Sequence, residues 1–167
     1  MDHDVRLHDT TVTLFGRADA LDHALSDELG RRGCTTHYVT VPTGWLSSTT
    51  HAVVRLDTES GAKALLQLID DTTRPRTHVV AVCALQDDTA ESERIDELCR
   101  RCGRVHDVSL VWHPALDAMA VQHADAGAIV PTDALAATIV DEITGQSARD
   151  ESSSYSTRTF EPAPPPH

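Results

Sequence analysis

Apolar positions along the chain follow two spacings in turn, and the first example lies between residues 11 and 33. The short apolar run Thr11–Phe15 favours a β-strand. After Gly16, apolar residues recur three or four positions apart, which predicts an amphipathic helix over Ala18–Arg31. The inward face of this helix consists of Ala18, Leu21, Leu25 and Leu29. Gly33 then supplies the residue type that helix C-termini prefer.

The same alternation of strand and helix patterns continues to about residue 145. Further strands are predicted at Cys34–Val41, His51–Leu56, Thr77–Leu85 and Asp107–Trp112. Further helices are predicted at Thr58–Asp70, Asp88–Cys102 and Thr132–Thr144, the last with Thr132 as its N-cap. The inward faces are Ala62, Leu65, Leu66 and Ile69 in the first of these three helices, and Leu135, Ile139, Val140 and Ile143 in the last. A sixth short strand is considered at Ala128–Val130, and Pro114–Asp125 fits neither pattern.

The order of these elements predicts the fold class. Thr77–Leu85 is almost entirely apolar, as expected of a central parallel strand that is covered on both faces. Strands that alternate with helices imply parallel crossovers. We therefore expect an α/β protein, a three-layer sandwich with a mostly parallel, Rossmann-like sheet. Residues 1–10 form a polar lead-in, 11–145 the domain, and 146–167 a Ser/Thr/Pro-rich tail that is predicted to be disordered.

Composition excludes several classes of partner. The formal net charge is −12, and clustered basic residues for phosphate contacts are missing, so nucleic-acid binding is not expected. No apolar segment is long enough to span a membrane, and the polar N-terminus does not resemble a signal peptide. The four cysteines then indicate reduced thiols in a cytoplasm. A composition rich in Ala, Arg and Asp is typical of a GC-rich bacterial genome.

Four segments occur in an order that is found in a known family. They are FGRADALDHALSDELGRRGC (residues 15–34), HVVAVCAL (78–85), HDVSLVWHPAL (106–116) and AGAIVPTDALAATIVDEI (126–143). Together they resemble parts of the extended short-chain dehydrogenase/reductase family, the NAD(P)-dependent epimerase/dehydratase type of Rossmann protein. The resemblance implies a Rossmann fold and NAD or NADP as cofactor, held at the opening turn near Gly16, Arg17 and Asp19.

The chain departs from that family where the family's chemistry takes place. The family's phosphate loop is GxxGxxG; Gly16 matches its first glycine, but Asp19 and Asp22 stand at the other two positions. Carboxylates there would repel a pyrophosphate. The family's proton transfer uses a tyrosine and a lysine in a YxxxK motif, and this sequence contains no such motif.

Cysteine and histidine residues offer other candidate sites. Cys83 lies near the end of the central strand, where a thiol nucleophile with His106 or His113 as its base is conceivable. Cys99 and Cys102, followed by His106, have a spacing that zinc sites and redox pairs use. However, both cysteines lie on the apolar stripe of their helix, and buried cysteine packs as a small hydrophobic residue.

These observations favour a non-catalytic function. We expect a degenerate relative of the epimerase/dehydratase family that acts as a binding, regulatory or assembly partner, including as a homodimer through surface helices. One alternative is an NAD(P)-dependent reductase or epimerase-like enzyme with a non-standard site at Cys83, His106 or His113. A second alternative is a metal-binding protein that uses Cys99, Cys102 and His106.

Overall fold

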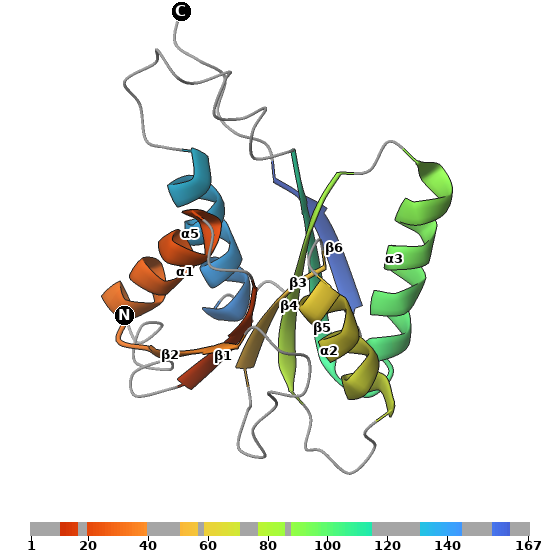
Figure 1. Ribbon diagram of the computed structural model, residues 1–167, viewed down its shortest axis with the longest axis horizontal. Helices are drawn as coiled ribbons and strands as arrows, with labels where there is room; N and C mark the ends of the chain where they lie inside the picture. Colours follow the sequence, from red (N-terminus) through yellow and green to blue (C-terminus); the bar gives the residue numbers. More distant parts are fainter. Residues whose placement is uncertain are drawn as a thin grey trace, which may run out of the picture.

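The computed structural model describes residues 11–16, 20–39, 51–56, 59–70, 77–85, 88–114, 131–144 and 155–160 (Figure 1). Its strands are β1 (Thr11–Phe15), β2 (Thr35–Val39), β3 (His51–Arg55), β4 (His78–Ala84), β5 (Asp107–His113) and β6 (Tyr155–Thr159). Its helices are α1 (Ala20–Arg31), α2 (Glu59–Asp70), α3 (Thr89–Cys102) and α5 (Pro131–Thr144). The strand considered at Ala128–Val130 and most of Pro114–Asp125 lie outside the described residues.

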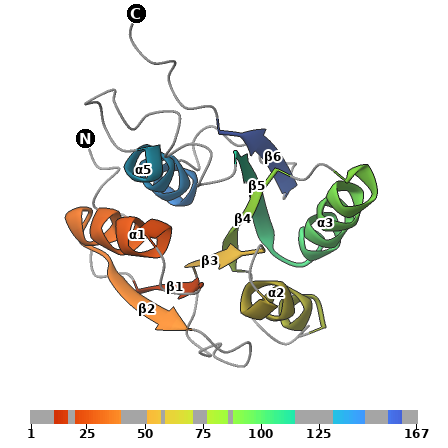
Figure 2. The same cartoon turned by 45° about the horizontal axis from the view of Figure 1, so that its top comes forward.

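The strands form one sheet in the order β2-β1-β3-β4-β5-β6, and every neighbouring pair is parallel. Helices α1 and α5 lie on one face of this sheet, and α2 and α3 lie on the other (Figure 2). The predicted three-layer sandwich with a parallel, Rossmann-like sheet is therefore confirmed. No helix in the described part of the chain combines the length and the apolar character needed to cross a membrane.

The strand order reverses between β1 and β3. The chain leaves β1 towards β2 on one side, and β3 then pairs with the opposite side of β1. The order β2-β1-β3-β4-β5 is one of two common doubly wound orders, and it differs from the 3-2-1-4-5-6 order of dinucleotide-binding domains. In open parallel sheets, ligands bind outside the carboxyl ends of the strands at such a reversal point. The carboxyl ends of β1 and β3 are thus the first place to look for a site.

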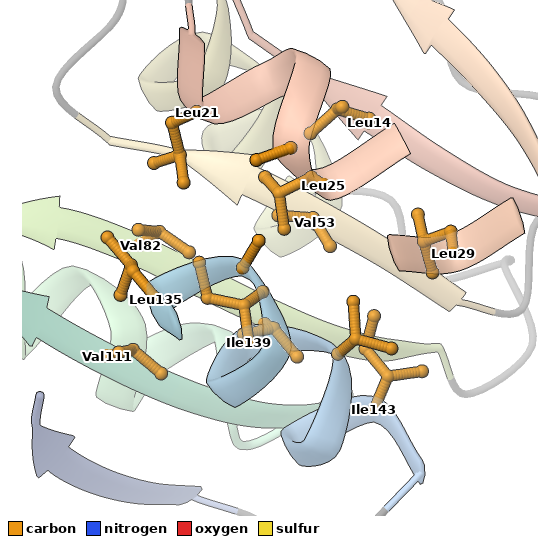
Figure 3. Packing of buried hydrophobic residues seen from close by; sticks show 14 of the residues in the cluster. Leu14, Leu21, Leu25, Leu29, Val53, Val82, Val111, Leu135, Ile139 and Ile143 are labelled. Atoms are coloured by element: carbon orange, nitrogen blue, oxygen red, sulfur yellow. The ribbon is translucent and has the colours of Figure 1, made fainter. Parts of the chain in front are cut away.

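The α1/α5 face holds one of the two apolar clusters found among the described residues (Figure 3). Of the predicted inward residues of both helices, Ala18 lies outside the described residues, and the others are buried there: Leu21, Leu25, Leu29, Leu135, Ile139, Val140 and Ile143. They pack on alternate residues of the strands, including Leu14, Val53, Val82 and Val111. Each fully buried aliphatic side chain stabilises the fold by about 1.5–3 kcal/mol. The side-chain spacing in the sequence therefore predicts this layer correctly.

The α2/α3 face corrects one sequence-based expectation. In α3, Ile95, Cys99 and Cys102 are buried, as the stripe predicts. In α2, however, Leu66 is 44% exposed, and Leu68 is buried instead. The buried positions of α2 are Gly61, Ala64, Leu65 and Leu68. They form a stripe next to the predicted one. Because both stripes contain apolar residues, the spacing of apolar residues in the sequence does not show which stripe faces the sheet.

Two helix starts follow known end preferences. Asp88 caps α3, since its side chain accepts a hydrogen bond from the backbone N–H of Ala90 at 2.9 Å. The expected N-cap of the last helix, Thr132, is wrong, because α5 begins at Pro131 and Thr132 is its second residue. Proline is favoured in the first turn, where its missing N–H leaves no intrahelical bond unmade.

Part of the tail predicted to be disordered forms the sixth strand instead, over Tyr155–Thr159. Strand β6 pairs with β5 in parallel, with Val108 opposite Tyr155 and Trp112 opposite Thr159. The backbone N–H of Phe160 donates to Trp112 O at 2.7 Å, and the Phe160 side chain is buried in the α1/α5 cluster. Ordering of this Ser/Thr-rich segment thus depends on two anchors, Tyr155 and Phe160, that the overall composition obscures.

Candidate functional site

Four polar or backbone groups meet where the strand order reverses. Gly16 directly follows β1, and Arg55 is the last residue of β3. Asp22 lies in the first turn of α1, and Tyr38 lies in β2. Because β1 is paired in parallel with both β2 and β3, these elements bring the four residues together at the carboxyl ends of the strands. We call this group the Asp22 cluster.

The Asp22 carboxylate is held by two side chains. Arg55 Nη1 donates to Asp22 Oδ1 at 3.1 Å, and Tyr38 Oη donates to Asp22 Oδ2 at 3.2 Å. The ion pair is buried, with side-chain exposure of 0% for Arg55 and 3% for Asp22. Tyr38 closes the cluster from the outer strand and is 37% exposed.

Local sequence explains this arrangement. Strand alternation directs Val53 to the α1/α5 face, and Arg55, two residues later, points the same way at the strand end. The first turn of α1 lies there, and a carboxylate in a first turn is favoured by the helix dipole. An arginine buried without a counter-charge would cost several kcal/mol, so Asp22 makes burial of Arg55 tolerable.

Gly16 is required by the position of the carboxylate. A Cβ at residue 16 would lie 2.3 Å from Asp22 Oδ2 and 2.6 Å from Cγ. The backbone N–H of Gly16 also donates to Val39 O at 3.2 Å, which fixes the turn against β2. The space that a glycine opens for close approach at this turn is therefore filled by a side chain of the same protein.

The arrangement changes how the predicted phosphate-loop residues are understood. Gly16 lies at the strand-order reversal, whereas Arg17 and Asp19 lie outside the described residues. Asp22 occupies the space next to Gly16 and forms an ion pair with Arg55. An incoming phosphate would have to displace this carboxylate from both of its donors.

Cys83 and His113 do not form a site together. Cys83 contributes to the α2/α3 cluster. His113 follows Val111 by two residues and so points to the α1/α5 face, where it is fully buried. Its Nδ1 lies 2.7 Å from Pro114 O. The sheet itself separates the thiol from this imidazole.

His106 lies at the amino ends of the strands, whereas the Asp22 cluster lies at their carboxyl ends. It directly precedes β5, and its Nδ1 accepts a hydrogen bond from the backbone N–H of Thr77 at 3.0 Å. The side chain is 1% exposed. His106 therefore links the amino ends of β4 and β5, and it is too far along the sheet to serve as a base for Cys83.

The paired cysteines are buried thiols. Cys99 and Cys102 are both fully buried, and all four cysteines are free. Burial raises the pKa of Cys102 to about 12, and burial together with neighbouring Cys102 raises the pKa of Cys99. Thiols with raised pKa values remain protonated at neutral pH and are poor ligands and nucleophiles. Among the residues that the structure describes, no three His, Cys, Asp or Glu side chains are placed to hold a metal ion.

Sequence reasoning missed Arg55 and Tyr38. The available signal was the single arginine in the apolar run HAVVRL, because a charge that ends a buried strand requires a partner. Asp22 was recognised only as a departure from a glycine motif. Its two partners lie 16 and 33 residues away, and neither separation corresponds to a local motif.

Fold and site together define a parallel α/β protein of Rossmann-like architecture. The buried ion pair of Asp22 and Arg55 fills the position where its strand order reverses. In comparisons of sequence and structure, no family model, no curated protein and no solved structure matches the chain.

Proposed function

We propose that this protein is a catalytically degenerate Rossmann-like protein, related to NAD(P)-dependent epimerases/dehydratases, that acts as a non-catalytic binding, regulatory or assembly partner. One observation carries the proposal. The Asp22 carboxylate fills the space next to Gly16 at the strand-order reversal, and Arg55 and Tyr38 hold it there.

Electrostatics support the loss of dinucleotide binding. A pyrophosphate placed beside Gly16 would meet the Asp22 charge at contact distance. Two like charges 4 Å apart repel by about 4 kcal/mol at an effective dielectric constant of 20. Arg55 offers little compensation, because its guanidinium already donates to Asp22. Phosphate binding would thus break one buried pair to make another.

The state of the tyrosines supports the loss of proton transfer. The family's reaction needs a tyrosine whose pKa is lowered by a nearby lysine. Here Tyr38 donates to Asp22, and Tyr155 donates to Asp96. Burial and the bond to Asp96 raise the pKa of Tyr155, which is the direction opposite to the one that catalysis requires.

Neither alternative has a comparable observation in its favour. A Cys/His enzyme needs its thiol and imidazole on one face of the sheet, and Cys83 and His113 lie on different faces. A metal site at Cys99 and Cys102 needs thiolates, whereas burial raises the pKa of both groups. We therefore propose no reaction for this chain.

Nucleotide titration tests the proposal. We expect no saturable binding of NADH or NADPH up to millimolar concentration, followed by cofactor fluorescence and by calorimetry. In Asp22→Gly the carboxylate is removed and Arg55 becomes available to a phosphate, so weak binding should appear. Asp27→Gly is the matched control, because Asp27 is an exposed acid of the same helix. Saturable binding by the wild-type protein would overturn the proposal.

A further inference from the structure

The connection from β5 through α5 to β6 has the opposite hand to the other helix crossovers. Helix α1 connects β1 to β2, towards the β2 edge of the sheet, and lies on the α1/α5 face. Helices α2 and α3 connect their strands in the other direction, towards the β6 edge, and lie on the opposite face. These three crossovers share one hand. Helix α5 also leads towards the β6 edge, but it crosses the α1 face (Figure 2). Parallel crossovers are right-handed in roughly 98% of cases, because a twisted strand and a right-handed helix pack back onto the sheet in that way.

Strand β6 pairs with β5 along its length, its Arg158 forms an ion pair with Glu142 of α5 at 2.9 Å, and a side chain anchors it at each end. At its start, Tyr155 donates to Asp96 of α3, and the Arg100 guanidinium lies 5.4 Å from the centre of the Tyr155 ring. After its end, Phe160 is buried in the α1/α5 cluster. Between them, the residues Thr157, Arg158 and Thr159 are exposed. The strand thus carries one anchor for each face of the sheet.

The edge that β6 covers requires a strand. Val108 and Leu110 of β5 are fully buried, and a bare β5 edge would expose unpaired backbone groups beside them. The contact between β5 and β6 does not require that both strands belong to one chain. Residues 145–154, which separate α5 from β6, are ten in number and span at most roughly 33–36 Å when extended. Exchange of β6 between two copies would use this reach.

We propose that two copies of this chain exchange β6, so that each β6 completes the sheet of the other copy. The exchange keeps the same pairing of β5 with β6 and the same anchors at Tyr155 and Phe160. It also removes the crossover of unusual hand, because α5 and β6 of one chain then belong to different sheets. A twofold axis repeats the contact and closes the assembly. The inference rests on the proposed assembly role and names its partner, a second copy.

Light scattering of the full-length protein gives the first test. We expect a particle of twice the chain mass of 18.1 kDa after size-exclusion chromatography over a wide range of concentrations. A particle of 18.1 kDa at all concentrations would overturn the proposal without affecting the result of the nucleotide titration. The two hypotheses therefore fail separately.

Disulfide trapping gives the second test and locates the contact. Ser109 of β5 and Ser156 of β6 are register partners, with their hydroxyl oxygens 3.5 Å apart. One chain carries only Ser109→Cys with an affinity tag, and the other carries only Ser156→Cys. After joint refolding and mild oxidation, we expect a disulfide between the two chains, involving about half of all chains for random pairing.

The double variant, with both substitutions in one chain, makes the trapping test decisive. It should give covalent dimers if β6 is exchanged, and a monomer with an internal disulfide if it is not. The wild-type protein is the control, because its four cysteines are buried. An internal disulfide alone, or no disulfide in any preparation, would contradict exchange of β6 in this register. Peptide mass spectrometry identifies the linked positions.

Discussion

The Asp22 carboxylate lies so close to the backbone of Gly16 that a methyl group on residue 16 would be 2.3 Å from Oδ2. In a nucleotide-binding Rossmann protein, glycine at the first turn lets a pyrophosphate approach the backbone. Here Gly16 admits a carboxylate from the following helix. The anion next to this turn therefore belongs to the protein itself.

We expect Gly16→Ala to lower the free energy of unfolding by about 1–3 kcal/mol, the usual cost of inserting a methyl group into a packed site. The carboxylate cannot turn away cheaply, because Arg55 and Tyr38 both hold it. Urea denaturation at fixed protein concentration measures the change. In an Asp22→Ala background the same substitution should cost almost nothing. Equal costs in the two backgrounds would contradict the close packing.

The buried ion pair gives a second prediction. Arg55→Met leaves the Asp22 charge buried without its cation and should destabilise the protein by about 3–5 kcal/mol. Adding Asp22→Asn removes that charge, so the double variant should recover most of the loss. Arg94→Met is the control: its pair with Glu91 is solvent-exposed and screened, so this substitution should leave stability nearly unchanged. Urea denaturation measures the changes in the free energy of unfolding. If the changes for Arg55→Met and Asp22→Asn simply add in the double variant, the two charges do not interact as proposed.

Attachment of β6 to α3 should weaken in acid. Partial burial would raise the pKa of Asp96, but hydrogen bonds from Arg100 and Tyr155 outweigh it and lower this pKa below the ordinary 3.8. A lowered carboxyl pKa means that the contact contributes fully above about pH 4 and is lost as the pH falls through the folded-state value. Trp112 pairs with Thr159 of β6, so its fluorescence in a Trp45→Phe background reports on the strand.

The comparison of two variants isolates Asp96 in this acid transition. We expect Asp96→Asn to weaken β6 attachment at neutral pH and to flatten the change in Trp112 fluorescence below pH 4. Glu93→Gln is the control, because Glu93 is an exposed acid of the same helix. If both variants keep the wild-type pH profile, the bond between Asp96 and Tyr155 does not control the strand.

The cysteines should be unreactive in the native protein. A pKa of about 12 for Cys102, in place of 9.0, lowers its thiolate fraction at pH 8 by roughly a thousandfold. We expect slow modification by Ellman's reagent in buffer and reaction of all four thiols in denaturant. Added zinc should leave the melting temperature unchanged. Rapid modification of Cys99 or Cys102 in the native protein would support a redox role for them. Stabilisation by zinc would support the metal-binding alternative.

Much of the fold could be predicted from local spacing. Short apolar runs predict β1, β3, β4 and β5, and β-branched residues predict β2. The leucine and isoleucine stripes predict the buried faces of α1 and α5, because burial of one face imposes a period on the sequence. Strand β6 has no such period. Its anchors, Tyr155 and Phe160, are five residues apart and so point to opposite faces, where each meets a different helix layer.

The Asp22 cluster could be predicted only in part. The sequence shows an acid where the motif that it resembles has glycine, and it shows an arginine in an apolar strand. It does not show that these two charges meet, because the contact depends on β3 pairing with β1. That pairing is set by the strand order, which local spacing does not encode.

The orientation of α2 provides the last prediction, because two apolar stripes compete along this helix. Leu68 is 1% exposed, whereas Leu66 is 44% exposed. Alanine preserves helix propensity at both positions, so the two substitutions differ only in the packing that they remove. We expect Leu68→Ala to cost about 2–5 kcal/mol in urea denaturation, as for other buried leucines. Leu66→Ala should change stability by less than about 0.5 kcal/mol. The reverse ranking would mean that the helix is rotated and that the stripe predicted from the sequence faces the sheet.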